Sequence, residues 1–479
     1  MHPLLQLWEA LWAIPYIGLY LGLGWLAYLL GLGIYIVLQK REPAATISWL
    51  VSLAALPYIG FLIYHVFGPQ KIRRHRLRRA RTRVGMKGEM PVGGDDAVEL
   101  ALLGQATTGL PPTTATRVEL LVDGAATYDA LIAAIRTARH HVHLEYYIYT
   151  PDRSGTALRD ALIERARAGV KVRLLLDAVG SSKCNDAFFA ELLAAGGELA
   201  WFHPMRFGQV WKRPWLNLRT HRKIVVVDGR IGFAGGINIT DEENERLRAD
   251  AYRDLHVQVD GDAVRALQLV FVEDWAYATG NRDFIGDVAR AMPPPERGPI
   301  PTQVITSGPD SDWEAIHRLH VGAIHAAKRR VWLVTPYFVP GEAAMMALTS
   351  AALGGLDVRL LVPKQSDSKL VTFAARSYFD TLLAAGVKVY EYGPRMLHTK
   401  ALLVDDDLAL IGSANFDHRS FRLNFEICLL FRDADVAADL AKLIEREFAN
   451  APRARDDRDR SFWRARLPEA FARLLSPLL

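Results

Sequence analysis

Two segments of the chain carry the same chemically active residue types at the same spacing. The first set is His221, Lys223, Asp228 and Asn238, and the second is His398, Lys400, Asp405 and Asn415. An imidazole can attack phosphorus or deliver a proton near neutral pH. Lysine and asparagine can hold phosphoryl oxygens while negative charge spreads over them in the transition state. Each set offers one imidazole, and a two-step displacement at phosphorus needs two.

The residues between each histidine and its aspartate are mostly Val, Ile or Leu, which is typical of a buried strand. Residues i and i+2 of a strand project from one face, so we expect His221 and Lys223 to point together, as in the second copy. Asp228 and Asp405 have the opposite parity, and we expect each to tie the strand end to neighbouring backbone. The glycine before each asparagine would let the backbone approach a bound anion.

A lone histidine on an apolar strand is more often a satisfied core or surface residue than a catalytic one. Two copies that match in register argue against that interpretation. The duplicated pattern resembles the phospholipase D superfamily, whose members pair two such motifs around one phosphodiester. One departure is Gly236, which stands where the second copy has Ser413. We expect the missing hydroxyl to alter one local hydrogen bond and not the mechanism.

Three further segments narrow the resemblance to one group within this superfamily. Residues 41–68, 252–264 and 421–430 are similar to the corresponding parts of bacterial cardiolipin synthases. The resemblance implies transfer of a phosphatidyl group from one phosphatidylglycerol to another, which gives cardiolipin and glycerol. It also implies a phosphatidyl-histidine intermediate on His221, with His398 as the acid and base. No metal and no cofactor is expected, because lysines and asparagines supply the positive and donor groups.

Two carboxylates follow the motifs, each on the next expected strand. These are Asp254 and Glu426. The resemblance implies a crossed pairing, in which Glu426 orients His221 and Asp254 orients His398. Such an acid fixes the tautomer and stabilises the imidazolium. The alternative is that each carboxylate forms only a surface salt bridge.

The amino-terminal region carries two runs without charged side chains, at residues 13–38 and 44–67. Each is long enough to cross a bilayer as a helix, which takes about 20 residues. The connector at 39–43 is short, so we expect a transmembrane hairpin. A cleaved signal peptide is the competing interpretation, and the lack of any Lys or Arg before Lys40 disfavours it.

A basic cluster follows the second run. It consists of Lys71, Arg73, Arg74, Arg76, Arg78, Arg79, Arg81 and Arg83. The positive-inside bias then predicts a multi-pass protein of the bacterial inner membrane with its catalytic region in the cytoplasm. Without these eight charges the formal net charge of +5 becomes −3, so basicity is local. This disfavours nucleic acid as a partner and favours anionic phospholipids such as phosphatidylglycerol.

Helices alternate with short apolar strands in both halves, which predicts an α/β fold. With the resemblance, we expect two pseudo-symmetric phospholipase D-like α/β/α lobes, an active site between them and a transmembrane helical hairpin before them. The expected divisions are an anchor (1–70), a basic segment and linker (71–116), a first lobe (117–290), a linker (291–301), a second lobe (302–452) and a carboxyl-terminal amphipathic segment (453–479).

Three smaller features complete the sequence analysis. Cys184 and Cys428 lack disulfide or metal-site spacing, so we expect two buried thiols. Trp211 and Trp215 stand among basic residues, which suits either a membrane interface or an ordinary packed loop. The carboxyl-terminal segment from residue 461 could lie on the bilayer or dock on the enzyme body.

Other functions remain open at this stage. A phospholipase D hydrolase would use the same motifs with water as the acceptor. A membrane-tethered scaffold with a decayed enzyme fold is opposed by the complete residue sets in both halves. A nuclease is disfavoured by the charge distribution. The sequence leaves open the oligomeric state and whether phosphatidylethanolamine can replace one substrate.

Overall fold

The computed structural model describes residues 15–38, 46–47, 49–51, 53, 95–204, 217–455 and 461–476. The chain divides into two compact units, Met1–Pro69 and Gln70–Leu479. In the first unit, helix α2 (Ile17–Leu38) is long and apolar enough to cross a membrane, by length and composition. Most of the second expected span (44–67), the basic cluster at 71–83 and the two tryptophans at 211 and 215 lie outside the described residues.

The first lobe is built on a mixed sheet with the strand order β2-β8-β7-β6-β3-β4-β5. Its strands are β2 (Arg117–Val122), β3 (His141–Tyr146), β4 (Lys171–Asp177), β5 (Glu198–Phe202), β6 (Ile224–Val227), β7 (Ile231–Gly235) and β8 (Leu255–Asp260). Strands β3, β4 and β5 run parallel, and the other pairings are antiparallel. Strands such as β3 and β6 are buried along their whole length, which explains their continuous apolar runs.

Helices cover both faces of this sheet. They are α7 (Asp123–Thr137), α8 (Arg153–Arg167), α9 (Ala190–Ala194), α10 (Ala263–Thr279) and α11 (Ile285–Ala291). Helix α8 shows why the sequence folds this way. The Asp152 side chain caps it by accepting a hydrogen bond from the Gly155 backbone N–H, and Leu158, Leu162 and Ala166 form a buried stripe.

The second lobe repeats this topology. Its sheet has the order β1-β9-β17-β15-β14-β10-β12-β13. The strands are β1 (Thr113–Ala115), β9 (Ile300–Ser307), β10 (Arg330–Val334), β12 (Asp357–Pro363), β13 (Lys388–Tyr392), β14 (Ala401–Val404), β15 (Leu408–Gly412) and β17 (Glu426–Arg432). From β9 to β13, each strand has a counterpart in the first sheet with the same parallel or antiparallel pairing. The expected pseudo-symmetric α/β lobes are therefore confirmed.

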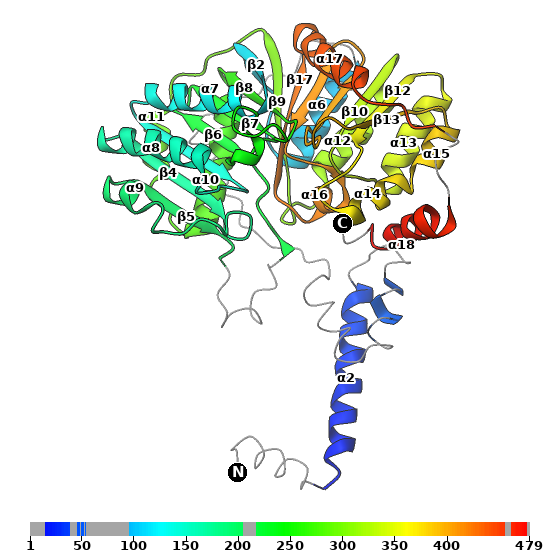
Figure 1. Ribbon diagram of the computed structural model, residues 1–479. Coiled ribbons are helices and arrows are strands. Elements are labelled where there is room, and N and C mark those ends of the chain that lie inside the picture. The colour runs from blue at the N-terminus through cyan, green and yellow to red at the C-terminus, as the bar shows by residue number, and fades with distance from the viewer. Residues whose placement is uncertain are drawn as a thin grey trace. The chain divides into compact units, whose positions relative to one another are not determined.

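Smaller elements complete this lobe. They are α12 (Ala315–Ala326), α13 (Glu342–Leu353), α14 (Lys369–Arg376), α15 (Phe379–Ala384), α16 (His418–Arg422), α17 (Ala434–Ala449) and the short pair β11 (Phe338–Val339) and β16 (Phe416–Asp417). The two lobes share one hydrophobic core, which contains Val257 and Phe271 of the first lobe and Leu403 and Ile427 of the second. Figure 1 shows the lobes side by side, with the first in cyan and green and the second in yellow and orange.

The segment expected to be a linker before the first lobe is partly regular structure. Residues 95–108 form helix α6 (Asp95–Thr108), and β1 pairs with β9 of the second lobe. This part of the linker is ordered because Leu100 packs into the core of the second lobe and Gln303 donates to the Ala101 carbonyl. The chain therefore touches the second lobe before it builds the first.

The carboxyl-terminal segment also docks on the second lobe. It forms one π-helical turn (Phe462–Arg466) and helix α18 (Leu467–Leu474), which packs against α14. Ala472 is buried in the lobe's core, whereas Trp463 and Leu474 are about three-quarters exposed. Docking on the enzyme body and an apolar outward face thus occur together. Both cysteines are buried and free, as expected.

Candidate active site

Each motif is held in place by backbone of the other lobe. The apolar runs form β6 and β14 as expected, and the motif histidines lie just before these strands. The His221 N–H donates to the Phe425 carbonyl at 2.9 Å, and the His398 N–H donates to the Arg253 carbonyl at 2.7 Å. Phe425 and Arg253 each immediately precede a carboxylate, Glu426 and Asp254. The crossing therefore brings each histidine beside an acid from the opposite half.

The His221 imidazole lies against Glu426. Its Nδ1 is 3.0 Å from Glu426 Oε2, and the same oxygen accepts from the Ser413 hydroxyl. Burial lowers the pKa of His221 to about 4, although the neighbouring carboxylate opposes the shift. The ring is therefore neutral at physiological pH. A proton on Nδ1, donated to the carboxylate, leaves the Nε2 lone pair for attack.

The His398 imidazole lies against Asp254, at 2.6 Å between Nδ1 and Oδ2. Lys400 Nζ is 2.9 Å from the same Nδ1 and 3.4 Å from Asp254 Oδ2. The short carboxylate contact requires the proton on Nδ1, so we assign the lysine's donations to the His398 carbonyl and Asp254. Burial and then the Lys400 charge lower the pKa of His398, and Asp254 opposes them.

The two lysines couple the half-sites electrostatically. Lys223 is fully buried, and its Nζ donates to the His221 carbonyl at 2.8 Å. Burial lowers its pKa to about 7, Glu426 opposes this shift, and the Lys400 ammonium adds to it. The Lys400 charge also lowers the pKa of His221, and Lys223 lowers that of His398. Both motifs therefore contribute to one electrostatic site.

The motif aspartates bind backbone. Asp228 accepts from the N–H groups of residues 139, 140 and 141, at 2.8 Å each. Asp405 accepts from residues 328, 329 and 330 at 2.8–3.1 Å. Both have a φ of 52°, in the left-handed region where aspartate is tolerated better than most residues. Their carboxylates tie the strand ends to the start of β3 and β10.

The chain is similar to known proteins over most of its length. The family described as cardiolipin synthase, PLD-like domain, matches residues 131–275 and 321–450, and the family described as phospholipase D-nuclease N-terminal matches residues 29–69. Cardiolipin synthase of Geobacillus kaustophilus is 41% identical over 94% of this chain and 91% of its own. Cardiolipin synthase 2 of Bacillus anthracis is 38% identical over 94% of this chain and 89% of its own. The chain belongs to the cardiolipin synthase family.

The fold has a solved counterpart. Phosphatidylserine synthase of Haemophilus influenzae Rd KW20 aligns with a TM-score of 0.60, at 15% identity, over 80% of this chain and 100% of that chain. At that identity the likeness concerns the fold alone. With family membership and helix α2, the chain is a membrane-associated member of the cardiolipin synthase family.

The two asparagines of this family member are not equivalent. Asn238 Nδ2 donates to Glu243 Oε1 at 3.1 Å, and its Oδ1 accepts from the Ile148 N–H at 3.3 Å. The Asn415 N–H donates to the Ser420 hydroxyl, and its buried Oδ1 has no hydrogen-bond partner within the described residues. The side-chain amide of Asn238 is thus held at both its nitrogen and its oxygen, whereas that of Asn415 is less committed.

Glu243 is a site residue that the sequence analysis missed. It ends a short 3-10 helix (Asp241–Glu243), is 1% exposed, and its Oε1 lies 3.7 Å from His398 Nδ1. Its other oxygen has no hydrogen-bond partner in the described part of the chain. Burial and then the Asp254 charge raise its pKa to about 8. The sequence carries one signal for this residue, because the duplication breaks at its position. The second copy has Ser420, and not a glutamate, five residues after its asparagine.

Glu243, Asp254 and His398 also form a cluster that could hold a metal ion. Their ligand atoms lie within 4.8 Å of one another, and all three residues are buried. The Lys400 ammonium contacts two of the same groups and supplies the positive charge there. A divalent cation would have to displace this ammonium or stand beside it, which Coulomb repulsion opposes.

Glycine is needed at position 236 for a different reason from the one expected. A Cβ built on it would lie 2.2 Å from Asp254 Oδ1, so the backbone makes room for the protein's own carboxylate and not for a bound anion. In the second half, the hydroxyl of Ser413 instead donates to Glu426. The residue at this motif position therefore fits the carboxylate that lies against it. Gly236 leaves room for Asp254, and Ser413 donates to Glu426.

Proposed function

We propose that the chain is a cardiolipin synthase that transfers a phosphatidyl group between two phosphatidylglycerol molecules. Membership of the family supports an enzyme of phospholipid transphosphatidylation. The observation that carries the proposal is the pair of buried imidazoles, each beside a carboxylate of the opposite lobe. The reaction exchanges one phosphodiester for another, so no nucleotide is consumed.

In the first step, His221 Nε2 attacks the phosphorus of the donor lipid. The bond between phosphorus and the glycerol oxygen breaks, and His398, which is protonated on both ring nitrogens as this step begins, gives that oxygen the proton of its Nε2. Free glycerol leaves, and a phosphatidyl-histidine remains on His221. Lys223, Lys400, Asn238 and Asn415 hold the phosphoryl oxygens as charge develops.

In the second step, His398 takes the proton of a primary hydroxyl on the acceptor phosphatidylglycerol. That oxygen attacks the phosphorus, the bond to His221 breaks, and cardiolipin forms. The choice of His221 as nucleophile comes from the resemblance, and the contacts support it. The phosphorylated ring is a cation, which the Glu426 carboxylate at Nδ1 stabilises, whereas the Lys400 ammonium beside His398 Nδ1 suits a group that releases its proton.

The membrane placement belongs to the same proposal. Helix α2 and a second span at 44–67 form a hairpin in the bacterial inner membrane, and the basic cluster keeps the catalytic region in the cytoplasm. Both substrates then arrive from the bilayer. This favours a lipid alcohol over water as the acceptor.

The test is product analysis. Purified full-length protein is incubated with labelled phosphatidylglycerol in mixed micelles containing a chelator. Cardiolipin and glycerol in equal amounts are expected. Phosphatidic acid as the only product would make the protein a hydrolase, and dependence on an added divalent metal would contradict the proposed chemistry.

Matched variants test the roles of the two histidines. His221→Ala and His398→Ala should each lower the rate by roughly 10³-fold or more, because neither half completes both steps. His325→Ala, in the last turn of α12 and away from both motifs, serves as the control. A covalent lipid adduct trapped on His398 would reverse the assigned roles.

A further inference from the structure

A cavity opens beside the second half-site. It has a volume of about 700 Å³ and is lined by residues of two segments, around 250–252 and 364–396. Tyr252 and Met396 are two of its lining residues. The Tyr252 ring centroid lies 5.5 Å from that of His398, and the Met396 carbonyl accepts from the Arg253 N–H. The cavity therefore adjoins the imidazole that we assign as acid and base.

The reaction defines what must occupy this side of the site. The leaving glycerol of the first step and the attacking hydroxyl of the second exchange protons with the same His398 atom. They must therefore occupy the same place in turn. The acceptor carries a phosphodiester at the far end of its glycerol, where the leaving glycerol carries only a hydroxyl. Transfer to lipid needs a second anion site beyond His398.

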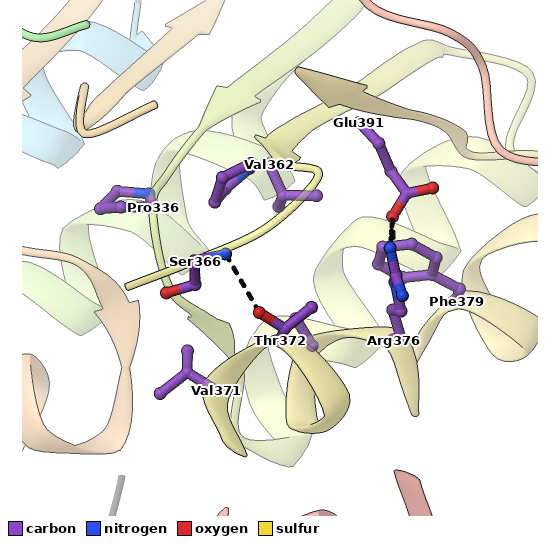
Figure 2. A pocket seen from close by; sticks show the side chains of 10 residues that line it. Pro336, Val362, Ser366, Val371, Thr372, Arg376, Phe379 and Glu391 are labelled. Carbon is purple, nitrogen blue, oxygen red and sulfur yellow. Dashed lines mark hydrogen bonds and ion pairs between the residues drawn. The ribbon is translucent and has the colours of Figure 1, made fainter. Parts of the chain in front are cut away.

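The charges of the cavity suit such an anion. Arg376 is paired with Glu391 and Arg395 with Asp123, and neither carboxylate lines the cavity. Figure 2 shows a smaller neighbouring pocket, which shares Ser366, Thr372 and Arg376 with the lining of this cavity. There Arg376 points toward Glu391, and the Ser366 N–H donates to the Thr372 hydroxyl. The remaining basic residues, Lys364 and Lys369, are exposed. Their ammonium groups make no hydrogen bond or ion pair to any residue that the structure describes.

Two acidic residues also line the cavity, and each has partners of its own. Asp367 accepts from the Tyr337 and Ser366 hydroxyls, at 2.8 Å each. Asp250 pairs with Arg248 at 2.7 Å. The two lysines are thus the uncommitted charges of the cavity. An ammonium binds phosphate as a point charge without fixed geometry.

The wall of the cavity adjoins a surface that suits lipid. Helix α14 contributes Thr372 and Phe373, and it packs against α18. The Tyr378 hydroxyl bonds to Ser476, and the Arg473 guanidinium lies 4.7 Å from the Tyr378 ring. On its other side α18 exposes Phe471 and Leu474. An apolar face beside a cationic cavity is the pairing that a phospholipid headgroup and its acyl chains require.

We propose that this cavity is the acceptor subsite, with the acceptor's glycerol against His398 and its phosphodiester at Lys364 and Lys369. This inference rests on the proposed function. It gives a residue-level reason for the preference of a lipid alcohol over free glycerol or water, because only the lipid brings a second phosphate.

The experiment compares two acceptors of the phosphatidyl group, phosphatidylglycerol and free glycerol. Full-length wild type and the double variant Lys364→Gln, Lys369→Gln are given phosphatidylglycerol and labelled free glycerol in mixed micelles. Cardiolipin formation needs the acceptor phosphate, whereas incorporation of labelled glycerol into phosphatidylglycerol does not. The ratio of the two rates should fall about tenfold in the variant, as expected for loss of charged phosphate contacts. Lys442→Gln is the control, because this lysine is exposed on α17 and binds only Asp439 among the described residues.

Added glycerol 3-phosphate distinguishes a lipid from a free phosphate ester. If glycerol 3-phosphate lowers the ratio of cardiolipin formation to glycerol incorporation in the wild type but not in the variant, the subsite binds glycerol phosphates in general. If it has no effect while the variant's ratio still falls, the subsite takes the phosphate only as lipid. Both outcomes support the subsite. An unchanged ratio in the variant would overturn it, whereas a wild type that forms only phosphatidic acid would overturn the proposed function instead.

Discussion

Replacement of Glu426 by glutamine tests the crossed pairing most directly. The carboxylate is fully buried, and its Oε2 accepts from both His221 and Ser413, while Oε1 accepts from Asn424 Nδ2 at 3.2 Å. A glutamine carbonyl at the Oε2 position keeps both of the first two hydrogen bonds. Its NH2 group then faces Asn424, whose buried Oδ1 has no partner in the described residues and can accept after a flip of the amide. Glu426→Gln therefore removes charge with little change of shape.

The Glu426→Gln substitution removes the electrostatic stabilisation of a cation on His221. Two unit charges about 3 Å apart interact with roughly 5 kcal/mol at an effective dielectric constant of about 20. Because the variant retains the hydrogen bond, about 4 kcal/mol of this interaction energy is lost in the transition state. At about 1.36 kcal/mol for each factor of ten, the rate should fall on the order of 10³-fold.

The assay is cardiolipin formation from labelled phosphatidylglycerol under saturating lipid, with a thermal melt to verify folding. Ser413→Ala is the matched control. It removes one donor to the same oxygen and leaves the charge, so a loss of no more than about tenfold is expected. A folded Glu426→Gln variant within about threefold of wild type would refute the role of the carboxylate.

Three further predictions concern the frame of the site. Gly236→Ala places a Cβ against Asp254 and should lower thermal stability by about 1–3 kcal/mol together with activity, whereas Gly286→Ala on α11, with its nearest neighbour atom at 3.6 Å, should do neither. Asp405→Asn weakens the acceptor of three backbone N–H groups and should cost about 1–3 kcal/mol in denaturant unfolding, with the rate falling as well. Glu243 has a raised pKa of about 8 against an unperturbed 4.5, so the folded state binds the extra proton between these values and stability falls as the pH rises through that window. Glu243→Gln should melt above wild type at pH 8 and match it near pH 5, and equal melting curves at pH 8 would contradict the assignment.

Local pattern was sufficient to predict the two motif strands, although the motif histidines and lysines lie just before them and not on a strand face. The apolar runs of β6 and β14 and the backbone-binding role of Asp228 and Asp405 follow from strand parity and from one sequence. The pairing of each histidine with the opposite acid was available only through the resemblance. Nothing in the spacing shows that residue 425 lies beside residue 221, because that contact depends on how the lobes meet.

Other features depended on tertiary contacts and could not be read from pattern. Helix α6 has a weakly amphipathic sequence, and it is ordered by Leu100 in the core of the second lobe. The role of Gly236 as space for Asp254 required the position of a neighbouring strand. Glu243 stands among other acidic residues in the sequence, and only its burial separates it from a solvated surface charge.

The departures from symmetry differ between the two half-sites, and this suggests a division of labour between the halves. Glu426 gives His221 a negative partner that a hydroxyl supports, which suits a ring that must carry a positive charge through an intermediate. His398 has the Lys400 ammonium at 2.9 Å and the Asp254 carboxylate at 2.6 Å, so its environment holds charges of both signs near one ring. Such a ring gains little from either protonation state, which is what a group needs if it must give a proton in one step and take one in the next. The lipid-sized cavity also opens on the His398 side. A duplicated fold that began with two equal half-sites would thus have assigned them to different substrates: the first holds the phosphatidyl group, and the second handles the alcohols that leave and arrive.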